Sequence, residues 1–251
     1  MAVIDVAGLG RVFSAHRVFR PGPAIVALCD VSLSVADATI CGVLGGNGAG
    51  KTTLLEILAT LIRPSAGTAA IDGCDVARQP AAVRRSIAYC PAGGRGFYAR
   101  LTGRHNLEFF GALHDVPADQ LRSRIETAAA LFDVRDALDR RVEACSDGMR
   151  QRLGLARAHL SGARVWLLDE PTRGLDPRGR ELAGRVLREQ ARPGGVTILM
   201  TTHDLAEAMA ICDRVVVLHR GRVTLDTPVS EIGQPGALQA AYARATADEA
   251  P

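Results

Sequence analysis

Apolar residues along this chain follow two spacings, and the spacing changes from block to block. Short apolar or alternating runs, which predict β-strands, lie at residues 3–12, 27–35, 40–44, 68–71 and 86–90. A three-to-four spacing then takes over and predicts helices at residues 104–113, 118–132 and 148–160. No run between residues 101 and 160 has the character of a strand, so this whole block is predicted to be helical.

Strand and helix signals alternate in the last third of the chain. Strands are predicted at residues 163–170, 196–201 and 214–219, and helices at residues 178–190 and 205–211. Such alternation favours an α/β fold with a largely parallel sheet and helices on its faces. The main domain is expected to span residues 1–235, with an inserted helical subdomain at about residues 93–160. Residues 236–251 are expected to form a short alanine-rich tail.

Composition agrees with one sizeable globular unit. The chain has 251 residues, enough for one large domain or for one domain with a subdomain. Hydrophobic residues make up 47% of the sequence but aromatic residues only 4%, so the core must consist mainly of aliphatic side chains. The net charge of +3 is too small to indicate nucleic-acid binding by itself. Six cysteines without a C-x-x-C pair are predicted to be buried free thiols in a reducing compartment.

The sequence contains no pattern typical of secretion or of a membrane span. Residues 1–5 lack the basic segment and the long apolar core of a secretory signal. No apolar run approaches the roughly 18 residues that a membrane-spanning helix needs. We therefore expect a cytoplasmic protein that reaches a membrane only through a partner.

The first candidate for chemistry is a glycine-rich turn between a predicted strand and a predicted helix. The G-x-x-x-x-G-K-[ST] pattern is matched within Gly45, Gly46, Asn47, Gly48, Ala49, Gly50, Lys51, Thr52 and Thr53. Glycines let backbone N–H groups surround a phosphate, and the helix N-terminus adds partial positive charge. The pattern predicts that Lys51 reaches the β- and γ-phosphates and that Thr52 ligates Mg²⁺. Lys51 is the only lysine among 30 basic residues, and its compact ammonium suits a narrow cradle that a planar guanidinium would not fit.

A second candidate is a pair of carboxylates, Asp169 and Glu170, that follows the apolar run at residues 165–168. A buried strand there would deliver both to the carboxyl edge of the sheet, next to the glycine-rich turn. Asp169 is predicted to hold Mg²⁺ through water, and Glu170 to polarise a water aligned on the γ-phosphate. The alternative is an acidic pair that caps a helix. We disfavour it because Pro171 and Thr172 come next and the glycine-rich turn lies upstream.

Two further polar candidates are His203, at the same edge of the predicted sheet, and the pair Ser146 and Gly148, at the start of a predicted helix. His203 follows Thr201 and Thr202 at the end of a predicted strand, where it is expected to bond the γ-phosphate and to hold Glu170. A lone histidine is more often structural, but this placement reverses that preference. Ser146 is a good N-cap and Gly148 leaves the backbone open, which makes a second anion site possible. From local sequence alone, an ordinary capped helix start explains these residues better.

An aromatic candidate lies near the N-terminus. Residues 13–23 contain two prolines and are predicted to form a loop between the first two strands. Phe13, at the start of this loop, is predicted to stack on a base, because a phosphate site follows at the usual distance. The alternative is an aromatic ring that covers the rim of the sheet, and Phe19 is a weaker candidate.

The motifs occur in the order and spacing of the nucleotide-binding subunits of ABC transporters, which the chain resembles over roughly residues 3–230. The matching motifs are residues 45–53 for Walker A, 165–170 for Walker B, 146–152 for the signature, 174–176 for the D-loop, His203 for the switch histidine and Phe13 for the adenine-stacking aromatic. The resemblance implies a P-loop NTPase (RecA-like) parallel sheet core with an N-terminal antiparallel β subdomain and an inserted helical subdomain. It also implies bound ATP and Mg²⁺, with catalysis by Glu170 and His203. The nucleotide contacts that it adds are Ser146, Gly148 and Asp176.

The chain departs from the family pattern at four positions. Ala92 stands where a glutamine normally touches Mg²⁺ and the attacking water. Cys145 and Asp147 replace the common leucine and glycine of the signature, and Asp147 puts negative charge near a phosphate site. Arg173 replaces a usual small residue before the D-loop. An active ATPase is still expected, because the family's other key residues are retained: Lys51, Ser146, Gly148, Asp169, Glu170 and His203.

The resemblance implies the ATP-hydrolysing motor of an ABC transporter. Two copies are expected to pack head to tail around two ATP molecules and to drive a separate transmembrane permease, docked near residues 92–101. Residues 95–107 are similar to those in ATPases of drug, polysaccharide and lipo-oligosaccharide exporters, which favours export. The chain is then expected to lie on the inner face of the cell membrane, bound to its permease.

Two other classes of P-loop protein are alternatives to the transporter. A soluble ABC ATPase that acts on nucleic acid or ribosomes usually carries tandem cassettes, coiled-coil insertions or zinc modules, and this sequence has none. No nucleic-acid partner is therefore expected. A GTPase needs a guanine-reading N-K-x-D motif, which is impossible here because the chain has no lysine besides Lys51.

Overall fold

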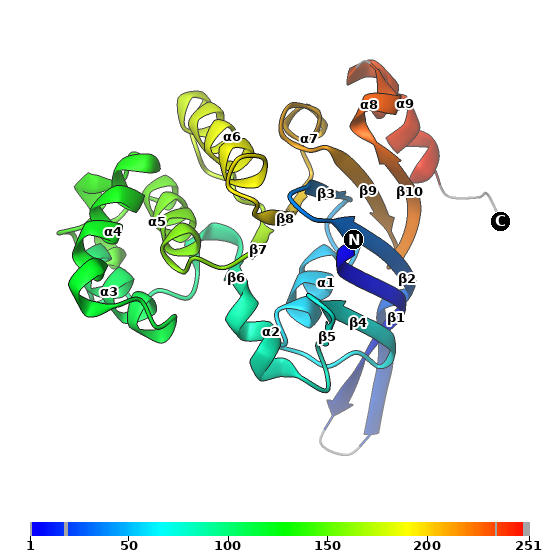
Figure 1. Cartoon of the computed structure of the whole chain (residues 1–251). Coiled ribbons are helices and arrows are strands. Elements are labelled where there is room, and N and C mark those ends of the chain that lie inside the picture. Colours follow the sequence, from blue (N-terminus) through cyan, green and yellow to red (C-terminus); the bar gives the residue numbers. More distant parts are fainter. Residues whose placement is uncertain (1, 18–19, 234, 248–251) are drawn as a thin grey trace.

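The computed structural model describes residues 2–17, 20–233 and 235–247, and the strands of this part form two sheets (Figure 1). The smaller sheet is antiparallel and has the strand order β2-β1-β4-β5. Its strands are β1 (Ala2–Arg17), β2 (Arg20–Ala36), β4 (Ala66–Ile71) and β5 (Cys74–Asp75). The sheet confirms the N-terminal antiparallel β subdomain that the resemblance implied.

The larger sheet has six strands in the order β10-β9-β3-β8-β7-β6. They are β3 (Ile40–Leu44), β6 (Ile87–Cys90), β7 (Val165–Asp169), β8 (Thr197–Thr202), β9 (Arg214–His219) and β10 (Arg222–Pro228). The five strands β9, β3, β8, β7 and β6, which are adjacent in this order, are all parallel. The edge strand β10 pairs antiparallel with β9, to which a hairpin connects it. The predicted α/β class with a largely parallel sheet is therefore confirmed.

The helices fall into two groups. Those that accompany the sheets are α1 (Lys51–Leu58), α2 (Pro80–Ser86), α6 (Pro177–Ala191), α7 (Leu205–Ile211), α8 (Val229–Ile232) and α9 (Pro235–Ala245). A separate lobe, drawn in green at the left of Figure 1, contains α3 (Gly103–Leu113), α4 (Ala118–Leu131) and α5 (Asp147–Leu160). Short 3-10 turns occupy Ala92–Gly94, Arg135–Ala137 and Val142–Ala144. The block predicted to be helical thus contains no named strand within its described residues.

The central strands are buried on both faces because they separate two cores. All five residues of β3 are buried. Cys41 and Val43 pack into a core with α1 and the antiparallel sheet, whereas Ile40 and Leu44 pack into a core with α4 to α7. Successive side chains of a strand point to opposite faces, so one apolar run serves both cores.

The parallel register brings three strand ends to one edge of the larger sheet. Leu44, the last residue of β3, pairs with Thr202 of β8, and Asp169 of β7 pairs with Thr201. The glycine-rich turn, Glu170 and His203 directly follow these strand ends in the sequence. The topology therefore gathers at one edge the candidates that lay far apart along the chain.

The prediction of a loop at residues 13–23 is wrong, because most of these residues belong to two strands. β1 continues to Arg17 and β2 starts at Arg20, and the two strands pair as a long hairpin that projects downward in Figure 1. β2 lies at the edge of its sheet, and edge strands are where prolines, which lack a backbone N–H group, are tolerated. Phe19 lies outside the described residues.

The alanine-rich end of the chain packs against the body. α9 contacts α7, and its Leu238 is fully buried. All six cysteines are free thiols, and four of them, Cys41, Cys90, Cys145 and Cys212, are buried, while Cys29 and Cys74 are partly exposed. Within the described residues, none of the helices combines the length and the apolar character needed to cross a membrane.

Asn106 supports the segment that enters the helical lobe. Its side chain is fully buried at the first turn of α3. Its Oδ1 accepts a hydrogen bond from Tyr98 N at 2.8 Å, and its Nδ2 donates to Thr102 O at 2.9 Å and to Tyr98 O at 3.1 Å. The side chain thereby supplies the acceptor for Tyr98 N and adds a second donor to the carbonyl oxygens of Tyr98 and Thr102, which also accept from Leu101 N and Asn106 N.

We expect Asn106→Leu to lower the free energy of unfolding by about 2–4 kcal/mol, because it removes the hydrogen bonds of a fully buried amide and leaves Tyr98 N without its acceptor. Urea unfolding followed by circular dichroism measures the change. Ser123→Ala, which removes a hydroxyl from an exposed hydrogen bond on α4, is the control and should change stability little. Equal stability of the two variants would contradict the role given to Asn106.

Candidate nucleotide site

The glycine-rich turn joins the end of β3 to the start of α1, as the sequence predicted. Two of its glycines are required by close contacts: a Cβ on Gly45 would lie 2.4 Å from Leu218 O, and one on Gly50 would lie 2.5 Å from Ala27 O. Gly50 also has a φ of 105°, which side chains disfavour. No side chain caps α1, so the first-turn N–H groups face the turn without a side-chain acceptor.

Lys51 lies inside this turn and is only 7% exposed. Its Nζ donates to the carbonyl oxygens of Gly45 at 2.6 Å and Gly46 at 3.0 Å. Burial lowers the pKa of Lys51, while the carboxylates of Glu170 and Asp169 act in the opposite direction. The ammonium is thus held by neutral carbonyl oxygens rather than by a carboxylate, which leaves its positive charge available to an anionic ligand.

Asp169 ends β7 and is 3% exposed. Its Oδ2 accepts a hydrogen bond from Thr52 Oγ1 at 2.8 Å, and its Oδ1 accepts one from Thr201 Oγ1 at 2.5 Å. The predicted pair of Mg²⁺ ligands, Thr52 and Asp169, is therefore brought into direct contact. Thr201 was missed as a site residue. Its signal was its place at the end of the strand parallel to β7, where the register sets it beside Asp169.

Glu170 follows with a φ of 48°, in the left-handed region that glycine prefers. Its backbone N–H donates to Thr201 O at 3.2 Å and to Thr201 Oγ1 at 3.0 Å, which holds this conformation. Its carboxylate contacts His203 Nδ1 through Oε1 at 3.2 Å and Arg173 NH1 through Oε2 at 3.0 Å. The structure thus brings together Glu170 and His203, as predicted, and adds Arg173, for which no role was predicted.

A cavity of about 460 Å³ opens over these residues. The predicted site residues that line it are Phe13, Gly46, Asn47, Gly48, Ala49, Gly50, Lys51, Thr52, Thr53, Asp169 and Glu170. Ala92 lies in the same wall, in the 3-10 turn after β6. Gly45 lies behind the turn against Leu218, and His203 lines an adjoining cavity of about 270 Å³ that also contains Glu170 and Asn47.

Phe13 lies on β1 of the long hairpin and lines the same cavity. The guanidinium of Arg11 lies over its ring, 4.4 Å from the centroid. The exposed apolar side chains of Ile25 and Val26 line the cavity next to it. A half-buried ring with a cation on one face and apolar neighbours is a suitable platform for a flat base.

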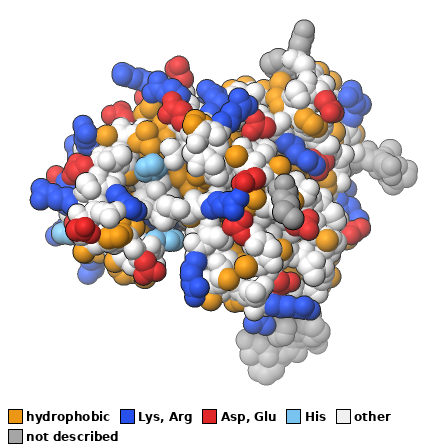
Figure 2. All heavy atoms as spheres, in the orientation of Figure 1, with side chains coloured by type: hydrophobic (Ala, Val, Ile, Leu, Met, Phe, Trp, Pro, Cys, Tyr) orange, Lys and Arg blue, Asp and Glu red, His pale blue; other side chains and the backbone are white. Residues whose placement is uncertain are grey.

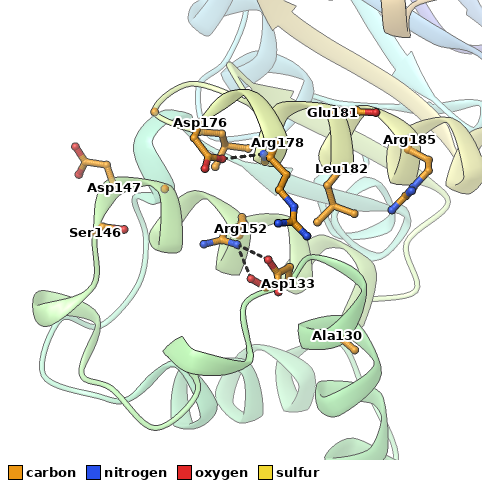
Figure 3. Close-up of a pocket in the computed structure, with 14 residues that line it drawn as sticks. Ala130, Asp133, Ser146, Asp147, Arg152, Asp176, Arg178, Glu181, Leu182 and Arg185 are labelled. Carbon is orange, nitrogen blue, oxygen red and sulfur yellow. Dashed lines mark hydrogen bonds and ion pairs between the residues drawn. The ribbon is translucent and has the colours of Figure 1, made fainter.

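Three predicted nucleotide ligands lie elsewhere. Ser146, Gly148 and Asp176 line a separate cavity of about 980 Å³ between the start of α5 and the start of α6 (Figure 3). Ser146 Oγ accepts from Met149 N at 3.2 Å and Asp176 Oδ1 accepts from Gly179 N at 2.8 Å, so both cap helices. Within one chain these residues do not share the cavity of the glycine-rich turn.

The donor set at Thr52 and Asp169 fits Mg²⁺. Hydroxyl and carboxylate oxygens are the hard ligands that this ion prefers, and it usually takes one or two protein oxygens together with waters and substrate phosphates. Among the described residues no group of three or more His, Cys, Asp or Glu could hold a metal ion.

Comparison with known proteins agrees with this geometry. The family model described as "ABC transporter" matches residues 28–173. The chain is 40% identical over 203 residues to the ABC transporter ATP-binding protein NatA of Bacillus subtilis, covering 79% of this chain and 80% of that protein. It is 43% identical over 210 residues to the daunorubicin resistance ATP-binding protein DrrA3 of Streptomyces coeruleorubidus, covering 82% of this chain and 65% of that protein.

Solved structures show the same fold. An ATP-binding subunit of an ABC transporter superposes with a TM-score of 0.80 at 28% identity, covering 97% of this chain and 99% of the other. A dimeric ATP-binding cassette solved in a post-hydrolysis state with ADP and Pi superposes with a TM-score of 0.82 at 22% identity, covering 90% of this chain and 98% of the other. The family model spans more than half of the chain. This chain therefore belongs to the ABC transporter family, as one of its ATP-binding, ATP-hydrolysing subunits.

Proposed function

We propose that two copies of this chain close head to tail around two ATP molecules and that their hydrolysis drives a separate membrane permease. One observation carries the proposal: Ser146 and Gly148 lie on a different cavity from the glycine-rich turn of the same chain. An anion site at the start of α5 can complete a nucleotide site only if a second copy presents it.

The residues around the first cavity then have distinct tasks. Lys51 and the backbone of the turn bind the β- and γ-phosphates, and Phe13 stacks on adenine. Thr52 and Asp169 hold Mg²⁺, which supplies positive charge to the phosphates when it is bound. Ser146, Gly148 and Asp176 of the second copy close the site from the opposite side.

Glu170 and His203 act on the water that attacks the γ-phosphate. The Glu170 carboxylate is nearly buried and fixed by its backbone, so it can orient a water and accept its proton as the phosphoryl group departs. His203 Nδ1 contacts Glu170 Oε1, so the imidazole holds the carboxylate in place. His203 is 62% exposed, which leaves its ring accessible to a terminal phosphate.

We infer that the permease binds at the helical lobe. Four large apolar side chains are exposed on the segment after the Ala92 turn and on α3: Tyr98, Leu101, Phe109 and Leu113. The Asn106 side chain hydrogen-bonds the backbone of Tyr98 and Leu101, which fixes the segment that carries these two side chains. A membrane partner docked here would place the chain on the inner face of the membrane. Export is favoured because one relative is named as a daunorubicin resistance protein.

A soluble ABC ATPase that acts on nucleic acid is the second candidate. Figure 2 shows basic and acidic side chains intermingled on the visible face, without a continuous basic area. Many arginines are also paired, such as Arg104 with Glu126 and Arg214 with Asp226. Both features favour the transporter, and salt-dependent binding of RNA or DNA by the pure protein would favour the alternative.

A mixing experiment tests the head-to-tail arrangement. Lys51→Ala removes the phosphate-binding ammonium, and Ser146→Asp places a negative charge at the second anion site while keeping a good N-cap. Each variant alone should be inactive. Mixed in equal amounts, they should regain roughly a quarter of the wild-type rate, because half of the dimers then contain one complete site out of two.

Phosphate release at fixed total protein measures this rescue. The matched control mixes Lys51→Ala with Glu170→Gln. Lys51 and Glu170 of one chain serve the same site, so in a mixed dimer one site lacks Lys51 and the other lacks Glu170. That mixture should stay inactive. Failure of the Lys51→Ala and Ser146→Asp mixture to exceed its components would contradict the arrangement.

A further inference from the structure

The carboxylate of Glu170 is held at both oxygens by residues from different segments. His203 Nδ1 lies 3.2 Å from Oε1, and Arg173 NH1 lies 3.0 Å from Oε2. The Glu170 side chain is 11% exposed and that of Arg173 is 66% exposed. A solvent-exposed cation therefore covers one oxygen of a nearly buried carboxylate.

Local backbone geometry directs Arg173 to this position. Arg173 N donates to Glu170 O at 3.1 Å, which closes a turn over residues 170–173. Glu170 enters the turn with a φ of 48°, and Gly174 leaves it with a φ of 79°. The turn folds the arginine side chain back over the carboxylate that starts it, so the contact is built into the chain rather than made by chance between distant surfaces.

Arg173 also faces the phosphate end of the site. It lines the cavity that contains Lys51 and Asp169, and it lines the adjoining cavity that contains His203. Ala92, on the same wall, contributes only a methyl group. The guanidinium can therefore pair either with Glu170 or with an anion in the larger cavity.

We propose that Arg173 binds the γ-phosphate of ATP and leaves the Glu170 carboxylate when it does so. The proposal rests on the proposed function, in which the phosphates lie beside Lys51. A terminal phosphate offers three oxygens and more negative charge than one carboxylate, and a guanidinium pairs with it through two parallel hydrogen bonds. The exchange forms and breaks only hydrogen bonds. It frees Glu170 Oε2 for the attacking water only when a γ-phosphate is present.

ADP lacks the γ-phosphate, so the proposal predicts a selective loss of affinity. Arg173→Ala should weaken binding of the β,γ-imido analogue of ATP by about tenfold or more, since hydrogen bonds between charged groups are among the strong ones. Binding of ADP should change far less. Arg173→Lys, which keeps the cation but loses the two parallel hydrogen bonds, should retain only part of the preference for the triphosphate.

Calorimetric titration of the full chain with each nucleotide and Mg²⁺ measures both affinities. Protein concentrations at which light scattering shows single chains exclude a contribution from closure of two copies. Arg95→Ala is the matched control, because Arg95 lines the same cavity but lies on the Ala92 turn. It should change the two affinities by the same factor.

An unchanged ratio of triphosphate to ADP affinity in Arg173→Ala would overturn the proposal, whether both affinities fall together or neither moves. Thermal unfolding checks that the variants are folded, and Arg173→Gln supplies a second variant if the alanine form is not. The outcome is independent of the base assigned to hydrolysis, because no nucleotide is turned over. Failure of that assignment would show instead as normal turnover by Glu170→Gln.

Discussion

Glu170→Gln is expected to bind ATP normally and to lower the rate of hydrolysis by about 10²–10⁴-fold, the usual contribution of a positioned general base. The amide has nearly the same shape as the carboxylate, so the turn and the contact with Thr201 should persist. It cannot accept the proton of the attacking water. Phosphate release at saturating ATP and Mg²⁺ measures the loss.

The same variant should trap two chains around unhydrolysed ATP. Light scattering with ATP and Mg²⁺ should show the mass of a dimer, and ADP should not produce it. Glu56→Gln is the matched control, because Glu56 lines the same cavity but lies on α1. Wild-type turnover by Glu170→Gln would contradict the role of Glu170 as the general base. A monomer at all protein concentrations would contradict head-to-tail closure.

The ends of the parallel strands were predictable from the sequence because short sequence motifs mark them. The glycine-rich turn requires a strand before it and a helix after it, and the carboxylates end an apolar strand. The bounds of β3, β7 and β8 were each predicted to within two residues. A parallel sheet then places these ends on one edge without further information.

Contacts that depend on register or on side-chain direction were not predictable in the same way. Thr201 lies beside Asp169 because β7 and β8 pair in one particular register. Arg11 supports Phe13 only because β1 continues past Val12 as part of a hairpin. The prolines suggested a loop, and the edge position of β2, a property of the whole sheet, overrode that local preference.

The roles predicted for Ser146, Gly148 and Asp176 show a third kind of limit. Local sequence favoured an ordinary capped helix start, and the family resemblance implied the nucleotide contacts, but one chain does not bring these residues to the glycine-rich turn. Motif spacing carries no information on whether two motifs meet within one chain or between two. Only the three-dimensional placement separates these cases, and it motivates the mixing experiment.

Lys51→Ala is expected to abolish measurable turnover, with a loss of about 10²–10³-fold or more, because it removes the charge that stabilises the phosphates during transfer. ATP affinity should also fall, by about tenfold or more. The fold should persist, since Lys51 Nζ bonds only the carbonyl oxygens of Gly45 and Gly46 in its own turn, and burying the ammonium is itself unfavourable.

Lys51→Arg distinguishes the effect of the positive charge from the effect of side-chain shape, because it keeps the first and changes the second. Lys51 is 7% exposed and its Nζ lies 2.6 Å from Gly45 O, in a turn whose backbone closely contacts Leu218. A planar guanidinium keeps the charge but needs more room, so Lys51→Arg should also lose most of its turnover. Phosphate release and nucleotide titration measure both variants, with thermal unfolding as the check on folding. Wild-type turnover by Lys51→Ala would mean that the only lysine of the chain does not bind the transferred phosphate.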